Sequence, residues 1–239
     1  MENKIIVIIP VRNEEENLPL VIGELLNLQL FSSSDIILVD NGSTDASSAI
    51  GKSFGVNVLF ENNLGYGSAC LAGISEIKKQ LLNPDCVLIM DGDGADDPDD
   101  IHKLIKMYNA NSTDLVIGSR VLGKREKGSL SLIQRFGNWL TCSLILLFYQ
   151  RKFTDLGPLR LIKYSSLLRM GLIDKTWGWN IEMQIRALQE KMNVIEIPVN
   201  YRKRKFGKSK ISGTLGMAMR VGIKILYTFF NLTLNKRNN

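Results

Sequence analysis

The feature that most constrains the fold of this chain is a repeated alternation of short apolar runs and helical patterns. Runs rich in isoleucine and valine occupy residues 4–10, 35–40, 56–60, 86–91 and 114–118. Between them, apolar residues recur at helical spacing, as at Leu18, Val21 and Ile22. Continuous apolar strands that alternate with helices are typical of a parallel sheet covered by helices on both faces. The sequence therefore predicts an α/β fold with a mostly parallel sheet.

The expected elements also indicate the domain organisation. Helices are predicted over residues 18–26, 67–81, 98–109, 131–149, 178–191 and 213–234, and another begins near Ser43 or Thr44, either of which can be an N-cap. The second half adds strands over 159–163 and 194–201. We expect one domain over residues 1–212, followed by an amphipathic helix and a short polar tail over 213–239.

Several classes of site are disfavoured by composition. The single histidine, His102, lies in an acidic stretch, which argues against a histidine-rich metal site and a Ser-His-Asp triad. Cys70, Cys86 and Cys142 are scattered and odd in number, so neither a disulfide framework nor a zinc site is indicated. This cysteine usage fits a reduced, cytoplasmic protein.

Neither a signal peptide nor a transmembrane span is expected. The opening MENKIIVIIP is short and is soon followed by acidic residues, unlike a signal peptide. The longest uncharged stretch, 136–150, has fifteen residues, fewer than the roughly 20 that a spanning helix needs.

Charge is distributed unequally between the two halves. Residues 1–120 hold 8 Lys and Arg against 18 Asp and Glu, whereas residues 121–239 hold 22 against 6. An acidic half suits a bound metal ion, and a basic half suits phosphate groups or an anionic membrane surface. Mutual attraction between the halves is an alternative explanation for part of this charge.

The acidic residues concentrate in DCVLIMDGDGADDPDD, residues 85–100, directly after an apolar strand. Asp91 and Asp93 are expected at the carboxyl edge of the sheet, where open parallel sheets bind ligands. Gly92 and Gly94 would let a ligand approach the backbone closely. Two carboxylates at this spacing suit Mg²⁺ or Mn²⁺, which also accept diphosphate oxygens. Solvated turn aspartates are the alternative, which the wholly apolar strand disfavours.

The later aspartates of this segment have a different interpretation. Pro98 fits the first turn of a helix, and acidic side chains there favour the positive end of the helix dipole. We therefore predict that residues 96–100 mostly begin a helix.

The motifs together resemble a known family. IIVIIPVRNEEENL, ILVDNGSTDAS, NNLGYGSACLAGI, LIMDGDGADDP and VIGSR occur in the order and spacing of the inverting family 2 glycosyltransferases with the GT-A fold. TDLGPLRLI, WGWNIEMQIRA and IPVNYRKRKFGKSKISGT resemble the branch that contains dolichol-phosphate mannose synthase and dolichyl-phosphate glucosyltransferase. The resemblance extends to about residue 215 and implies a Rossmann-like GT-A domain.

The resemblance also implies roles for individual residues. The nucleotide-sugar pocket would be lined by Pro10, Arg12, Glu14, Asp40, Gly65, Gly67, Asp91, Gly92 and Asp93. Asp40 would read the base edge, and Asp91 and Asp93 would hold the divalent ion on the diphosphate. Arg120 and Arg135 match positions that receive the acceptor's phosphate in the lipid-phosphate enzymes. Asp155 lies in the block that faces the donor sugar and the metal.

Three departures from the family pattern stand out. Tyr66 replaces a lysine that is common in the glycine loop, so this phosphate-side charge is absent or comes from elsewhere. Ala95 replaces a frequent glutamine and removes one polar contact. Many lipid-phosphate relatives carry C-terminal transmembrane helices, whereas only one amphipathic stretch is present here.

The basic and amphipathic segments leave alternatives open. Arg202, Arg204, Lys208 and Lys210 are expected to clamp the diphosphate or face anionic lipid, and a solvated loop is the alternative. A nucleic-acid partner is not expected, because only Phe206 is available for base stacking. The helix over 215–234 carries one polar stripe and either packs on the domain or lies in a membrane interface, as does the stretch around Trp139.

These features lead to a functional hypothesis. We expect a metal-dependent inverting glycosyltransferase that moves a hexose of the glucose or mannose class from a UDP- or GDP-sugar to a polyprenyl or dolichyl phosphate. Such an enzyme would be peripheral at the cytosolic membrane face and would serve cell-envelope glycan synthesis. Transfer to a soluble or saccharide acceptor is one alternative. A non-catalytic membrane or nucleic-acid binding module on the same fold is another.

Overall fold

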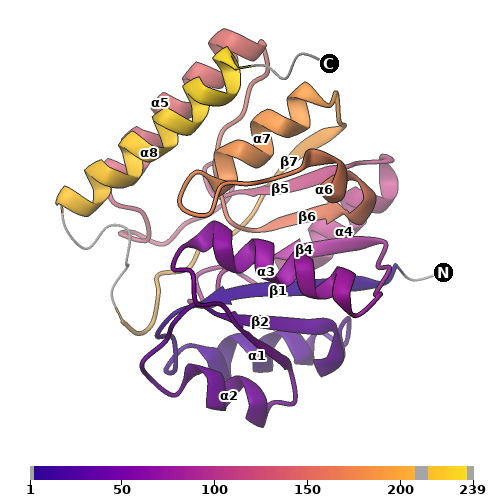
Figure 1. Ribbon diagram of the computed structural model, residues 1–239. Helices are drawn as coiled ribbons and strands as arrows, with labels where there is room; N and C mark the ends of the chain where they lie inside the picture. Colours follow the sequence, from indigo (N-terminus) through magenta and orange to yellow (C-terminus); the bar gives the residue numbers. More distant parts are fainter. Residues whose placement is uncertain (1–2, 208–214, 236–239) are drawn as a thin grey trace.

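The computed structural model describes residues 3–207 and 215–235, which fold around one seven-stranded sheet (Figure 1). Its strands are β1 (Ile5–Val11), β2 (Ile36–Asp40), β3 (Asn57–Phe60), β4 (Cys86–Ile89), β5 (Leu115–Ser119), β6 (Arg160–Lys163) and β7 (Val194–Pro198). The helices are α1 (Leu18–Asn27), α2 (Ser47–Ser53), α3 (Tyr66–Lys79), α4 (Asp100–Ala110), α5 (Leu132–Tyr149), α6 (Tyr164–Met170), α7 (Trp179–Gln189) and α8 (Leu215–Leu234), with a 3₁₀ turn, η1 (Ser33–Asp35).

The strands lie in the order β3-β2-β1-β4-β6-β5-β7. All neighbouring pairs are parallel except those of β6, which runs antiparallel to both β4 and β5. The mostly parallel α/β sheet predicted from the apolar runs is therefore confirmed. The reversal of β6 has a consequence for function, because it brings Arg160 at the start of β6 beside Ile89 and Ile117. The residues that precede β6 thus reach the carboxyl edge of the parallel strands.

Helices cover both faces of the sheet. Side chains of α1 and α4 pack on one face with strand residues such as Val7 and Leu38. Side chains of α3, α6 and α7 pack on the other face with strand residues such as Ile8 and Ile37. Neighbouring strand residues alternate between these two apolar cores, which explains why the strands read as continuous apolar runs.

Two helices begin later than expected, and one helix was not expected. α2 begins at Ser47 rather than near residue 43, because Asp40 accepts the backbone N–H of Ser43 and Asn13 accepts that of Thr44. These bonds fix a loop across the ends of β1 and β2 instead of a helical turn. α4 begins at Asp100, after Pro98. The short α6 was not expected, since its seven residues show too little periodicity to be distinguished from a loop.

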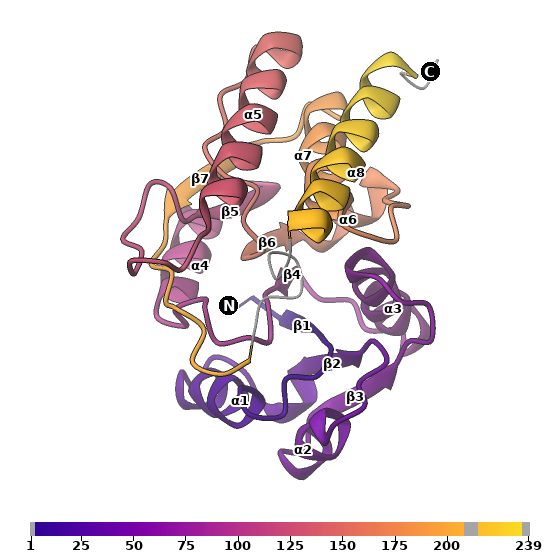
Figure 2. The same cartoon turned by 90° about the vertical axis from the view of Figure 1, so that its left-hand side faces the viewer.

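The helices α5 and α8 lie side by side and project beyond the rest of the molecule (Figures 1 and 2). α8 packs on the domain through its polar stripe: Lys224 Nζ lies 2.7 Å from Asp174 Oδ2, and the Thr228 hydroxyl donates to the same oxygen at 3.1 Å. Phe229 is fully buried beside them.

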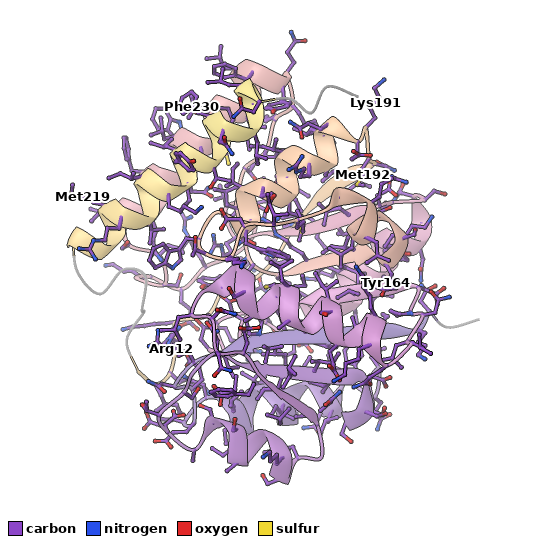
Figure 3. All side chains as sticks on the ribbon, in the orientation of Figure 1. Arg12, Tyr164, Lys191, Met192, Met219 and Phe230 are labelled. Atoms are coloured by element: carbon purple, nitrogen blue, oxygen red, sulfur yellow. The ribbon has the colours of Figure 1, made fainter. Side chains whose placement is uncertain are left out.

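The opposite side of α8 is apolar and exposed. Its exposed large hydrophobic residues are Met219, Ile223, Tyr227, Phe230 and Leu234, of which Met219 and Phe230 are labelled in Figure 3. The sequence left open whether α8 packs on the domain or on lipid. The structure places the polar side on the domain and turns an apolar side outward. None of the helices within residues 3–207 and 215–235 combines the length and apolar character needed to cross a bilayer.

The contact between Asp174 and α8 predicts an acid-sensitive contribution to stability. Burial by itself raises the pKa of Asp174, but hydrogen bonds from Lys224, Thr176 N–H and Thr228 outweigh it and lower the pKa. A lowered carboxylate pKa stabilises the fold at pH values above the unfolded pKa, and this contribution is lost as pH falls through the folded pKa.

We therefore expect Asp174→Asn to lower the free energy of unfolding by roughly 1–3 kcal/mol at pH 7. The difference from the wild type should shrink below about pH 4, as measured by denaturant unfolding at a series of pH values. Glu190→Gln is the control, because Glu190 belongs to a solvent-exposed pair with Arg169 and should change stability little. A difference for Asp174→Asn that does not vary with pH would contradict this account.

Candidate active site

Three carboxylates are buried together where β4 ends. Asp91 follows β4 and is half-buried, while Asp93 and Asp96 are buried. The N–H of Asp91 donates to Asp96 Oδ2 at 3.3 Å, and that of Ala95 donates to Asp93 Oδ1 at 3.0 Å. Burial and the neighbouring Asp93 raise the pKa of Asp91 to about 7. Burial and Asp91 likewise raise the pKa of Asp96. Like charges lie close together here with little water between them, so the cluster favours an added cation.

The prediction that residues 96–100 mostly begin a helix needs correction. Asp96 lies beneath the turn of Asp91, and one of its oxygens is buried with no hydrogen-bond partner among the described residues. Asp97 binds Arg202 at 2.8 Å. Asp100 is in the first turn of α4, but it also accepts the N–H of Asn200. Only Asp99 and Asp100 lie at the helix start, and the others have tertiary partners that the sequence does not reveal.

Arg204 neutralises part of the acidic cluster. Its guanidinium binds Asp93 Oδ2 at 2.7 Å and Glu14 Oε1 at 2.9 Å. Burial by itself lowers the pKa of Arg204, but Asp93 and Glu14 outweigh burial and raise it. Three residues that are far apart in the sequence and were predicted as site residues are thus in direct contact.

Arg202 binds residues of α1 and of the acidic segment. It binds Glu24 at 2.9 Å and Asp97 at 2.8 Å, and its N–H donates to Ala95 O at 2.7 Å. These contacts hold the segment 199–206 across the turn that carries Asp93. Lys208 and Lys210, which were expected to act with Arg202, lie outside the described residues.

Arg120 and Asp155 form a closed pair at the opposite side of the site. Asp155 is fully buried and accepts from the N–H, Nε and Nη2 of Arg120 at 2.8, 2.7 and 2.8 Å. The guanidinium also lies 5.0 Å from the centre of the Tyr201 ring. Arg120 follows β5 and Asp155 precedes the reversed β6, so the topology of the sheet brings them together.

The residues predicted for the nucleotide lie along the ends of β1 and β2. Pro10 is half-buried in β1, and Arg12 is exposed just beyond it (Figure 3). Asp40 ends β2 and is buried, and its carboxylate accepts from Ser43 N–H and the Ser48 hydroxyl. The structure therefore places Asp40 at the expected edge, with both oxygens already engaged.

The glycines of the loop before and within α3 have a clear packing role. A Cβ at Gly65 would lie 2.1 Å from Lys175 O, and one at Gly67 would lie 2.0 Å from Asp174 O. Their N–H groups donate to Asn41 Oδ1 and Thr176 O. The close approach that these glycines permit is therefore to the loop before α7, and their contact with a nucleotide stays a prediction. Gly92 is likewise closely packed, since a Cβ there would lie 2.5 Å from a methyl carbon of Val11.

One buried residue of the site, Arg160, was missed by sequence reasoning, and the half-buried Tyr66 was noted only as a departure from the family pattern. Arg160 is fully buried and donates to Gly157 O, Asn180 O and Gln184 Oε1, and burial lowers its pKa to about 10. Tyr66 lies close enough to Asp91 and Arg160 to affect the pKa of both. The sequence signal for a buried role of Arg160 was the presence of a charged residue within the otherwise apolar strand LRLIK.

A groove of about 1070 Å³ leads from these residues to α5 and α8. Its polar end includes Tyr66, Asp91 and Arg120, and Arg125 and Arg135 also line it. Both of these last arginines are exposed. The remaining lining is largely apolar and includes Leu132, Ile133, Phe136, Trp139, Leu146, Met219, Val221, Ile225 and Leu226. Asp91, at the edge of the acidic cluster, thus lies at the polar end of an apolar channel between two helices.

Comparison with known proteins identifies the family. Residues 6–177 match the family model described as glycosyl transferase family 2. The chain is 29% identical over 258 residues to UDP-N-acetylglucosamine–dolichyl-phosphate N-acetylglucosaminyltransferase of Methanococcus voltae, covering 99% of both chains. It is 26% identical over 220 residues to undecaprenyl-phosphate mannosyltransferase of Micrococcus luteus, covering 88% of both.

The fold matches solved structures as well. Glucosyl-3-phosphoglycerate synthase from Mycobacterium tuberculosis, in complex with Mn²⁺, UDP and glucosyl-3-phosphoglycerate, superposes with a TM-score of 0.75 at 16% identity, over 99% of this chain and 82% of that one. This likeness confirms the predicted GT-A architecture. The chain therefore belongs to the family 2 glycosyltransferases.

Proposed function

We propose that this glycosyltransferase moves a hexose from a nucleotide-diphosphate sugar to a polyprenyl or dolichyl phosphate at the cytosolic face of a membrane. The groove carries the proposal, because its polar end holds Asp91 and Arg120 while its walls are apolar side chains of α5 and α8. A sugar nucleotide requires the first environment and a prenyl chain the second. The relatives named for dolichyl and undecaprenyl phosphate support the same acceptor class.

Asp91 and Asp93 are suited to hold Mg²⁺ or Mn²⁺. Within residues 3–207 and 215–235, no group of three or more histidine, cysteine or acidic side chains is arranged to hold a metal ion by itself. Two carboxylates are nevertheless sufficient for an ion whose other ligands are diphosphate oxygens and water. Burial and the charge of Asp93 raise the pKa of Asp91, and a bound cation would offset both effects by favouring the charged carboxylate. When bound, the ion would neutralise the departing nucleoside diphosphate as a Lewis acid.

Arg204 is positioned to act with the donor. Its two carboxylate partners, Glu14 and Asp93, lie on either side of its guanidinium. We expect it to exchange Asp93 for a diphosphate oxygen when the donor binds, since a fork of N–H groups binds phosphate as it binds carboxylate. We assign Arg202 a structural role, because its guanidinium already binds the carboxylates of Glu24 and Asp97.

The acceptor's phosphate would bind near Arg120. Nε and Nη2 of Arg120 are held by Asp155, which leaves Nη1 for a phosphate oxygen. Arg125 and Arg135 line the same groove and are exposed, so they would guide an anionic headgroup. A phosphate monoester is already ionised near neutral pH, so it needs orientation rather than a general base. Asp155 is then a residue that orients Arg120.

Membrane contact would be made by α5 and α8. Leu147 on α5 is 73% exposed and Ile223 on α8 is 63% exposed, although both helices pack on the domain through other sides. Paired helices with outward apolar faces, in the basic half of the chain, suit the interface of an anionic membrane. Transfer to a soluble phosphate acceptor is the alternative within the same class, and the apolar walls of the groove disfavour it.

The metal and donor roles predict a loss of activity in Asp93→Asn. With a nucleotide sugar, Mn²⁺ and polyprenyl phosphate, the wild type should release nucleoside diphosphate, and chelation should abolish the release. Asp93→Asn should be slower by about a hundredfold, because charge stabilisation of the leaving group is weakened. Asp99→Asn, an exposed aspartate of the same segment, is the control. Undiminished release by Asp93→Asn would exclude a metal role for this residue.

The membrane role predicts a selective effect of Leu147→Glu. We expect this variant to bind vesicles that contain phosphatidylglycerol roughly ten times more weakly than the wild type. The reason is that one leucine side chain is no longer transferred from water into the bilayer. Leu81→Glu is the matched control, because Leu81 is 89% exposed but lies after α3, away from α5 and α8. Co-sedimentation measures both. Equal weakening of the two variants would mean that α5 does not face the membrane.

A further inference from the structure

Two side chains that line the groove each carry a buried polar atom with no hydrogen-bond partner among the described residues. These atoms are the hydroxyl oxygen of Tyr66 and the side-chain oxygen Oδ1 of Asn180. The Tyr66 hydroxyl lies close enough to Asp91 to help lower the pKa of that carboxyl, but the two groups are not aligned as a regular hydrogen bond. A buried polar group without a partner lowers stability, so each such group calls for an explanation. One explanation is a ligand that supplies the missing hydrogen-bond partners.

The orientation of Asn180 is fixed by its neighbours. Asn180 is in the first turn of α7, and its Nδ2 donates to Leu156 O at 3.1 Å. Because that carbonyl can only accept, the amide nitrogen must face it and Oδ1 must be the unpartnered atom. Arg160 Nη1 donates to Asn180 O at 3.0 Å and holds the backbone in place. Oδ1 is therefore a fixed acceptor that requires a donor from elsewhere.

Tyr66 supplies the complementary chemistry. It is the first residue of α3, and its ring packs against the apolar core. A phenol is neutral near pH 7, so its hydroxyl can both donate and accept. Tyr66 therefore presents a neutral hydroxyl beside Asp91.

The chemistry of Asn180 Oδ1 limits what can bind there. A phosphate oxygen cannot donate to it, and a prenyl chain has no donor at all. The remaining parts of the substrates are the sugar and the nucleoside. The nucleoside pocket is expected at Asp40 on β2, and β2 is separated from β6, which Asn180 adjoins through Arg160, by β1 and β4. This separation is three strand spacings, or roughly 14 Å.

We propose that Tyr66 and Asn180 read hydroxyl groups of the transferred sugar and thereby determine which sugar this enzyme accepts. The inference rests on the proposed function, since it requires a nucleotide-sugar donor at Asp91. A site with buried polar groups discriminates strongly, because a sugar that cannot pair with them leaves them desolvated and unpaired. The two relatives named above carry different sugars in their names, N-acetylglucosamine and mannose, so sugar choice varies among proteins similar to this chain.

The test is calorimetric binding in the presence of Mn²⁺. The probes are UDP-glucose, UDP-N-acetylglucosamine and GDP-mannose, with UDP and GDP as controls that lack the sugar. The variants are Tyr66→Phe and Asn180→Ala. Ser143→Ala is the matched control, since Ser143 also lines the groove but its hydroxyl already donates to Trp139 O at 2.8 Å.

We expect each variant to bind the preferred sugar nucleotide about tenfold more weakly, as for one lost hydrogen bond, and to bind the nucleoside diphosphate as the wild type does. Tyr66→Phe should also melt at the same temperature as the wild type or higher, because it removes a hydroxyl without a partner. A purely structural role would lower the melting temperature instead.

Two results would overturn the inference while leaving the proposed function intact. One is an equal loss of affinity for the sugar nucleotide and the bare diphosphate, which would place the contacts on the ribose or the phosphates. The other is unchanged binding of all sugar nucleotides by both variants. If the wild type binds none of the five probes, the proposed function itself fails, and the inference fails with it.

Discussion

The burial of three carboxylates at the end of β4 is the constraint on which the rest of the site depends. Asp91, Asp93 and Asp96 follow an apolar strand, and burial together with the neighbouring carboxylates raises the pKa of Asp91 and of Asp96. Such a cluster is tolerable only with nearby cations. Arg204 provides one by binding Asp93, and the proposed function assigns another to a divalent ion.

The fold provides those cations through contacts between distant segments. The segment 199–206 crosses the acidic turn and is held there by Arg202 and Arg204. The reversed strand β6 delivers Asp155 to Arg120, and Asp155 uses its whole carboxylate to orient that arginine. The acidic first half and the basic second half of the chain therefore meet at one site. Exposed and half-buried apolar side chains of the second half form the walls of the groove and the outer faces of α5 and α8.

The sequence predicted what depends on local pattern and missed what depends on tertiary partners. The seven strands are readable because each is a short, mostly apolar run, and the motifs indicated the family. The partners of Asp96 and Asp97 were not predicted, since Arg202 lies about a hundred residues away in the chain. The polar stripe at Lys224 and Thr228 suggested two environments, and only the position of Asp174 shows which side faces the domain. The sequence gives no signal for the unpartnered oxygen of Asn180. Its orientation is fixed by the hydrogen bond that the amide nitrogen of the same side chain donates to Leu156 O.

The central claim is that one groove accepts a sugar nucleotide at its polar end and a prenyl chain along its apolar walls. The most direct test measures kcat/KM with a fixed sugar nucleotide and Mn²⁺ for phosphate acceptors of increasing prenyl length, alongside glycerol phosphate and phosphoglycerate. The account predicts that kcat/KM rises with prenyl length until the groove is filled and that the two short soluble acceptors are poor substrates. Equal or better transfer to a soluble acceptor would contradict it.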